Sequence, residues 1–219
     1  MYVLYKGGNM RNVRSMRNTK CVINMKALQI LTGVLIMIGG LMMHSSQSLA
    51  ADPEFGVTVG MRSNNVDPTS TLANTYTASG KSGLNFGALA LIPIKDQFGF
   101  RTAFTYSQRF LSLDPKAGGN SNDIKLAYLD IPLTLYYKFS DYAGIFAGPM
   151  LSLMQSKDCS VSGGTCALTN VQSTIMPISF GVTFKFAPQM GGELVYEQAS
   201  GKLSDEIENL RSVGANFVF

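Results

Sequence analysis

From residue 54 to residue 219, large apolar side chains alternate with small, polar or charged ones. In 97–111 the even positions are mostly aromatic, whereas the odd positions carry Gly, Arg, Ala, Thr and Ser. A repeat of two residues is that of a β-strand, whose successive side chains point to opposite faces. The alternation predicts an all-β chain with eight strands, separated by turn-forming residues, at 54–62, 82–92, 97–111, 124–138, 142–155, 174–186, 190–199 and 212–219.

Alternation alone is compatible with two kinds of all-β protein. A soluble barrel or sandwich would bury the apolar face of each strand. A transmembrane barrel would turn that face toward lipid and line its interior with small and charged groups. Other features of the chain must decide between the two.

Strand length and connection length both favour the transmembrane barrel. Several segments run 11 to 15 residues, which matches or exceeds the roughly 9–11 residues of a tilted membrane-spanning strand. Short and long connections alternate, as expected for periplasmic turns and external loops. The short connections lie near 93–96, 139–141 and 187–189, and the long polar ones near 63–81, 112–123, 156–173 and 200–211.

The last segment supports barrel closure. It alternates up to Phe219, and an exposed apolar edge strand of this kind would invite aggregation. Pairing between the last and the first strand would remove that edge. We therefore expect an eight-stranded antiparallel up-and-down transmembrane β-barrel.

The start of the chain has the pattern of an export signal. Residues 27–43 form a stretch of 17 positions without a charge, preceded by Lys26. Ser48 and Ala50 occupy the −3 and −1 positions of a signal-peptide cleavage site. The alternative is a retained membrane helix, for which 17 residues are short of the usual span of about 20. We expect cleavage after Ala50.

Two regions follow from this interpretation. Residues 1–50 are a basic region and a cleavable signal peptide, and residues 51–219 are the barrel domain. Met25 is an ordinary start for a signal peptide, so the sequence leaves open whether residues 1–24 are translated.

Charge and histidine content exclude several functions. Six of the 18 basic residues precede residue 50, so residues 51–219 carry 12 basic against 14 acidic groups. Nothing in this balance suggests nucleic-acid binding. His44 is the one histidine of the chain and also precedes the barrel. The barrel therefore offers no histidine for a catalytic triad, a zinc site or a general base, and we expect no enzyme, cofactor or metal.

Two cysteines remain in the barrel domain, Cys159 and Cys166. An even count in an exported chain predicts a disulfide, here closing a short loop that contains Gly163 and Gly164. Two free thiols are the alternative.

Three short stretches carry a resemblance to a known family: YLDIPL at 128–133, GIFAGP at 144–149 and ANFVF at 215–219. The chain resembles the small eight-stranded outer-membrane β-barrel domains of Gram-negative bacteria, including the PorT-like group. The resemblance implies an outer-membrane location with lipid around the barrel. It also implies that the end of the chain, with Phe217 and Phe219, is the signal presented to the barrel-assembly machinery.

An eight-stranded barrel has an interior just wide enough to be filled by side chains. We therefore expect a structural or interaction role through the external loops, whose partner the sequence does not identify. A narrow, porin-like solute or ion channel is the second hypothesis. An enzyme is third, and a soluble lipocalin-type barrel is fourth because its interior would have to hold too many phenylalanines.

The polar faces of the strands predict an ionic network inside the barrel. Charges in a narrow barrel are costly unless they are paired, and a selectivity filter would show rings of one sign. The predicted lumen set has five basic and four acidic residues: Glu54, Arg62, Arg101, Arg109, Asp130, Lys138, Lys185, Glu193 and Glu197. We expect an interlocked plug, with Lys185 facing Glu193 across a hairpin, Arg62 and Arg109 near the outer mouth, and Asp130 and Glu197 nearer the middle.

Overall fold

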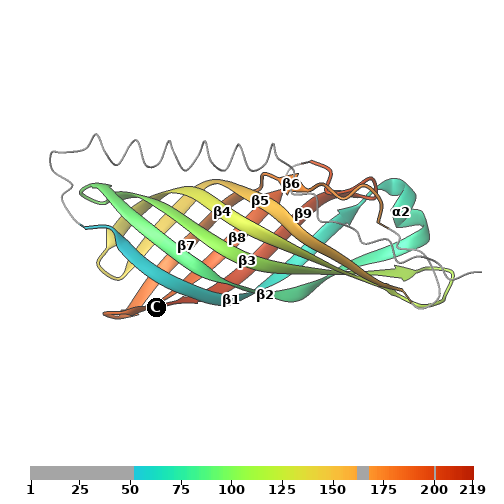
Figure 1. Cartoon of the computed structure of the whole chain (residues 1–219), viewed down its shortest axis with the longest axis horizontal. Helices are drawn as coiled ribbons and strands as arrows, with labels where there is room; N and C mark the ends of the chain where they lie inside the picture. The colour runs from blue at the N-terminus through green and yellow to red at the C-terminus, as the bar shows by residue number, and fades with distance from the viewer. Residues whose placement is uncertain (1–51, 162–167, 200) are drawn as a thin grey trace, which may run out of the picture. The chain divides into compact units, whose positions relative to one another are not determined.

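The computed structural model describes residues 52–161, 168–199 and 201–219 (Figure 1). These residues form nine β-strands and one short helix. In chain order the elements are β1 (Glu54–Pro68), α2 (Ser70–Thr75), β2 (Tyr76–Lys95), β3 (Phe98–Pro115), β4 (Asn122–Ser140), β5 (Ala143–Val161), β6 (Thr174–Ile175), β7 (Ile178–Ala187), β8 (Met190–Ala199) and β9 (Ile207–Val218). No helix among these residues has the length and hydrophobicity to cross a membrane.

The strands close into a barrel of antiparallel pairs. Each long strand pairs with the next along the chain, and β1 pairs with β9 from Thr58↔Val218 to Pro68↔Ile207. The ring order is therefore β1, β2, β3, β4, β5, β7, β8, β9, with the two-residue β6 attached to β5. This closure confirms the predicted eight-stranded up-and-down barrel.

One predicted strand is broken. The segment expected at 174–186 is divided into β6 and β7, and Met176 and Pro177 lie between them. Proline has no backbone N–H to donate to a strand ladder. Its carbonyl still accepts a hydrogen bond from the backbone N–H of Met150 at 2.8 Å, so β5 stays attached to the barrel wall here.

The two ends of the barrel differ. At one end, called the turn end, consecutive strands are joined by two-residue turns at 96–97, 141–142 and 188–189. The other end, called the loop end, carries α2 and the longer connections. Most strands extend further toward the loop end than predicted: β2, β3, β4 and β5 have 18 to 20 residues, whereas β7 and β8 have 10 each.

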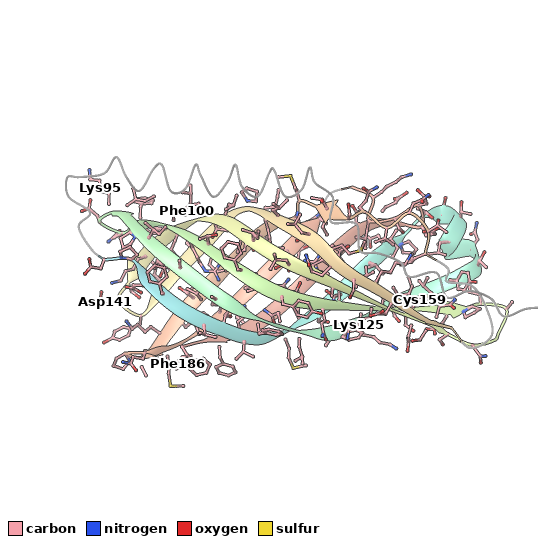
Figure 2. The ribbon with its side chains drawn as sticks, viewed as in Figure 1. Lys95, Phe100, Lys125, Asp141, Cys159 and Phe186 are labelled. Carbon is pink, nitrogen blue, oxygen red and sulfur yellow. The ribbon has the colours of Figure 1, made fainter. Side chains whose placement is uncertain are left out.

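The half of the barrel near the turn end is apolar outside and polar inside. Phe55 is 79% exposed and Leu135 is 67% exposed, whereas Thr58 and Thr134 on the same strands are buried in the interior. Figure 2 shows Phe186 projecting outward at this end. This arrangement is the opposite of a soluble protein and is typical of a barrel surrounded by lipid.

The half near the loop end has the reverse arrangement. Thirteen buried apolar residues form one cluster inside the barrel, which we call the apolar cap. Its members are Val66, Leu72, Leu111, Leu113, Ile124, Leu126, Tyr128, Leu168, Ile175, Ala199, Leu203, Ile207 and Leu210. Several outward residues of this half are polar and exposed, among them Asn65, Lys81, Asp123 and Arg211. Each long strand therefore changes its inside and outside polarity part-way along.

Three loop-end connections are tied together above the apolar cap. The backbone N–H of Thr69, before α2, donates to the carbonyl of Glu206 at 2.9 Å. The backbone N–H of Gln172 donates to the carbonyl of Leu203 at 2.8 Å, and the amide of Asn170 donates to Asp205 at 2.6 Å. The connections β1–β2, β5–β7 and β8–β9 thus form one packed lid over the loop end.

Candidate functional site

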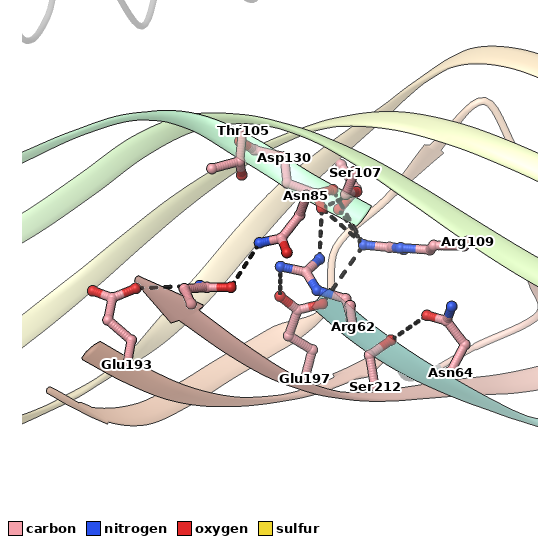
Figure 3. Close-up of polar contacts among 12 residues, drawn as sticks. Arg62, Asn64, Asn85, Thr105, Ser107, Arg109, Asp130, Glu193, Glu197 and Ser212 are labelled. Atoms are coloured by element: carbon pink, nitrogen blue, oxygen red, sulfur yellow. Dashed lines mark hydrogen bonds and ion pairs between the residues drawn. The ribbon is translucent and has the colours of Figure 1, made fainter. Parts of the chain in front are cut away.

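Four charged side chains meet in the middle of the barrel and form what we call the central network (Figure 3). Arg62 contacts Asp130 and Glu197, each at 2.9 Å. Arg109 lies 3.1 Å from Asp130 and 3.7 Å from Glu197. All four side chains are at most 5% exposed. Two cations and two anions therefore neutralise each other away from water.

Strand alternation brings the central network together. Arg62, Arg109, Asp130 and Glu197 lie on β1, β3, β4 and β8, at inward positions of each strand. They converge only because the barrel is closed. Along the strand ladder Arg109 lies four residues nearer the loop end than Asp130, as predicted, because it stands opposite Leu126. Arg62 lies two residues nearer the turn end than Glu197, so the predicted depth of Arg62 was wrong.

Asp130 is the most connected carboxylate of the network. Besides both arginines, it accepts a hydrogen bond from the Ser107 hydroxyl at 2.5 Å, and its backbone carbonyl accepts one from the Thr105 hydroxyl at 3.3 Å. Arg109 also lies with its guanidinium carbon 4.7 Å from the centre of the Tyr128 ring. The Nε and Nη1 atoms of Arg109 have no hydrogen-bond partner among the described residues. Its contacts with Asp130 and Glu197 therefore offset most of the desolvation cost of burying the guanidinium.

A second ion pair lies on the turn side of the central network. Arg101 binds both carboxylate oxygens of Glu193, each at 2.7 Å, and its guanidinium stacks on the Phe146 ring at 4.2 Å. Hydrogen bonds extend from Glu193 through Asn216 to Asn85, at 3.4 and 2.9 Å. This pair is also buried.

The remaining three residues of the predicted lumen set are exposed at the turn end: Glu54, Lys138 and Lys185. Lys138 binds Asp141 of the adjacent turn at 2.9 Å, and this hydrogen bond lowers the pKa of the Asp141 carboxyl. Six of the nine predicted residues are thus brought into the two buried groups, and three are not.

The predicted pairing of Lys185 with Glu193 was wrong. In the β7–β8 hairpin, Lys185 lies opposite Gly191, and Thr183 lies opposite Glu193. The turn has two residues and the ladder shifts register next to it, so equal distances in sequence from Gln189 do not make two residues opposite. Glu193 instead accepts hydrogen bonds from Arg101, which is 92 positions away in the sequence.

The other predicted site residues stay untested. Cys159 lies in β5 at the loop end, and Cys166 lies outside the described residues. Phe217 and Phe219 are 58% and 52% exposed on the outer face of the turn end. Their role as an assembly signal is still a prediction, and so is the signal peptide, which also lies outside the described residues.

Paired charges and apolar side chains occupy the interior of the barrel. Within the described residues, no three His, Cys, Asp or Glu side chains are grouped so that they could hold a metal ion. The carboxylates of the central network are already bound by arginine. A solute moving along the axis would have to displace the buried ion pairs and then the apolar cap.

Sequence reasoning missed the apolar cap. Its signal was present, because residues 110–113 carry Phe110, Leu111 and Leu113 on both faces of β3, where strict alternation would have left one face polar. Residues 124–129 repeat this, with Ile124 and Leu126 on one face and Leu129 on the other. Apolar residues on both faces of a strand end indicate a second core.

Comparisons with known proteins agree with this architecture. A profile described as "Outer membrane protein beta-barrel domain" matches residues 45–199, which is more than half of the 219-residue chain. No curated protein sequence matches the chain.

Among solved structures, the chain is similar to Ail, the attachment invasion locus protein of Yersinia pestis, in complex with the heparin analogue sucrose octasulfate. The identity is 14% and the TM-score 0.42, over 77% of this chain and 100% of that one. It is also similar to the outer membrane protein OprG from Pseudomonas aeruginosa, at 11% identity and a TM-score of 0.46, over 77% and 96% of the two chains.

Proposed function

This chain belongs to the outer membrane protein β-barrel domain family, and from that premise we propose that it is a closed, non-catalytic barrel with a structural or interaction role at its loop end. It is an outer-membrane protein of a Gram-negative bacterium, and lipid surrounds its apolar belt. Its partner would be a protein, an envelope component or a host surface that contacts the external loops.

The filled interior is the observation that carries this proposal. The central network and the Arg101–Glu193 pair occupy the middle of the barrel, and the apolar cap fills the loop end with side chains at most 8% exposed. Breaking buried, hydrogen-bonded ion pairs costs several kcal/mol. An interior of this kind favours a closed barrel over a channel for solutes. The loop-end connections are then the surface that remains for binding a partner.

The proposal predicts little or no steady conductance for the purified protein in planar lipid bilayers. Ion flow would require the buried pairs to separate in a medium that disfavours free charges. Current recordings at several voltages measure this directly. The alternative, a narrow channel, would be established by steady, ion-selective currents that change with Arg101→Gln but not with Lys81→Gln, which removes a charge from an exposed pair on the outer wall.

Signal cleavage after Ala50 and a bridge between Cys159 and Cys166 are part of the same proposal. We expect the intact mass of protein from outer membranes to correspond to residues 51–219. Treatment with an alkylating reagent before reduction should leave this mass unchanged. After reduction, two cysteines should be alkylated, because Cys21 is removed with the signal. A mass that includes residues before 51, or alkylation of the unreduced protein, would contradict the corresponding half of the proposal.

The bridge should contribute little to insertion, because it closes a short loop outside the lipid. Loop-entropy estimates give roughly 2–3 kcal/mol for a loop of this size. Cys159→Ser should therefore still reach the outer membrane as a folded barrel.

A further inference from the structure

A cavity of about 250 Å³ lies at the turn end of the barrel, and we call it the vestibule. It is at the opposite end from the loops, so nothing about it depends on the proposed loop-end function. Figure 2 shows Asp141, one of its rim residues, at this end.

The floor of the vestibule is formed by the Arg101–Glu193 pair. These two side chains are 7% and 3% exposed and are held by a bidentate contact. Phe146 packs beneath the Arg101 guanidinium and lies against Gly181, where an added Cβ would be 2.5 Å from the ring. The floor is thus fixed from several strands, so the vestibule is a preformed blind pocket and not a section of a pore.

One wall of the vestibule is cationic and hydroxylated. Lys138 on β4 and Lys185 on β7 line it together with Tyr136 and Thr183, whose hydroxyls are hydrogen-bonded at 3.2 Å. Lys185 acts on the Asp141 carboxyl from beyond contact distance and, among the described residues, is not held in a close ion pair. The partner of Lys138 is Asp141, whose side chain is 86% exposed, and exposed pairs of this kind contribute at most about 1 kcal/mol. Both ammonium groups are therefore available to another anion.

The opposite wall is apolar. Leu89 and Leu91 of β2 and Val218 of β9 line it. In the ring of eight strands, β2 stands across from β7 and β9 stands across from β4. The two lysines therefore face the three aliphatic side chains across the pocket.

From this juxtaposition we propose that the vestibule binds a small amphipathic anion, a monocarboxylate with a short apolar tail. The tail lies against Leu89, Leu91 and Val218, and the carboxylate is held by Lys138 and Lys185 at the mouth. Pockets with mostly apolar walls and a few convergent polar groups are the usual form of small-molecule sites.

The size of the vestibule limits the ligand. At about 30 Å³ per water-sized group, 250 Å³ holds roughly eight non-hydrogen atoms. Hexanoate, with eight non-hydrogen atoms, is therefore a suitable probe. The vestibule opens on the side of the short turns, which is the periplasmic side in barrels of this kind.

Binding can be measured with a fluorophore placed at the rim. The chain has no tryptophan, so Tyr142→Trp introduces a single one beside the vestibule. We expect hexanoate to change its fluorescence saturably in nanodiscs of zwitterionic lipid, and hexylammonium not to do so. Adding Lys138→Gln and Lys185→Gln should weaken hexanoate binding about tenfold or more, since two charge-assisted contacts are lost.

The control is Lys116→Gln, which removes an exposed lysine at the loop end and should leave the affinity unchanged. A response that rises linearly with concentration in all variants reports partition into lipid and overturns the proposal. Equal binding of hexylammonium, or no effect of the double lysine variant, also overturns it.

Discussion

Asp130→Ala should lower the free energy of unfolding of the barrel by about 3–5 kcal/mol, the usual cost of breaking a buried ion pair by removing one partner. Asp130 is fully buried and contacts both Arg62 and Arg109. Without it, two guanidinium groups share one carboxylate, that of Glu197. Denaturant unfolding in detergent or lipid, followed by heat-modifiable gel mobility, measures the loss.

Asp123→Ala is the matched control. Asp123 lies on the same strand and binds Lys81 at 2.7 Å, but both side chains are about half exposed. Its removal should cost at most about 1 kcal/mol. Equal effects of the two substitutions would contradict the interpretation that the central network holds the barrel together.

A double variant separates lost charge balance from lost packing. If the cost comes from an unpaired arginine, then Arg109→Met combined with Asp130→Ala should be less destabilising than Asp130→Ala alone, because Arg62 and Glu197 remain as a balanced pair. Additive losses in the two variants would show that the charges are independent. This comparison holds even where the single variant accumulates poorly, since the double variant is then expected to accumulate better.

Deletion of Phe219 should reduce the amount of folded barrel in the outer membrane by about tenfold or more. The backbone of Phe219 exchanges two hydrogen bonds with Val57, each at 2.9 Å, and these are the last closing contacts between β1 and the end of the chain. Backbone groups left unpaired in lipid cost several kcal/mol each. The deletion also removes the predicted assembly signal. Heat-modifiable mobility of the protein in purified outer membranes gives the folded amount.

Phe219→Leu and Phe219→Ala distinguish the two causes. Both keep the backbone hydrogen bonds, and leucine also keeps a large apolar side chain. A loss with both substitutions, comparable to that of the deletion, would assign the effect to the aromatic side chain, and a loss with alanine alone would assign it to apolar bulk. Wild-type amounts after the deletion would contradict both explanations.

Much of the barrel could be predicted from local pattern. The bounds of β8 agree with the predicted 190–199, and the pairing of the first with the last strand follows from the alternation at both ends of the domain. These features depend on neighbouring residues, which the sequence displays directly. The break at Pro177 also has a local cause, since proline cannot donate to the ladder.

The partners inside the barrel could not be predicted in the same way. Arg101 meets Glu193 across the lumen, at a sequence separation of 92 residues. Which residues share a level depends on the tilt and stagger of all the strands, and these are properties of the closed ring. Alternation identifies which side chains point inward, but register decides which of them touch.

Strand length differs around the ring, and this difference affects lateral contacts between the barrel and neighbouring molecules in the membrane. The β2–β5 side has strands of 18 to 20 residues, and the β7–β8 side has strands of 10. At about 3.3 Å per residue, the difference corresponds to roughly 26–33 Å of strand. In a crowded membrane, a neighbouring molecule that approaches within the membrane plane meets long strands with polar outer ends on the β2–β5 side. On the β7–β8 side it meets short strands. Lateral association would therefore prefer one side of the barrel over the other, because the strands on the two sides differ in length.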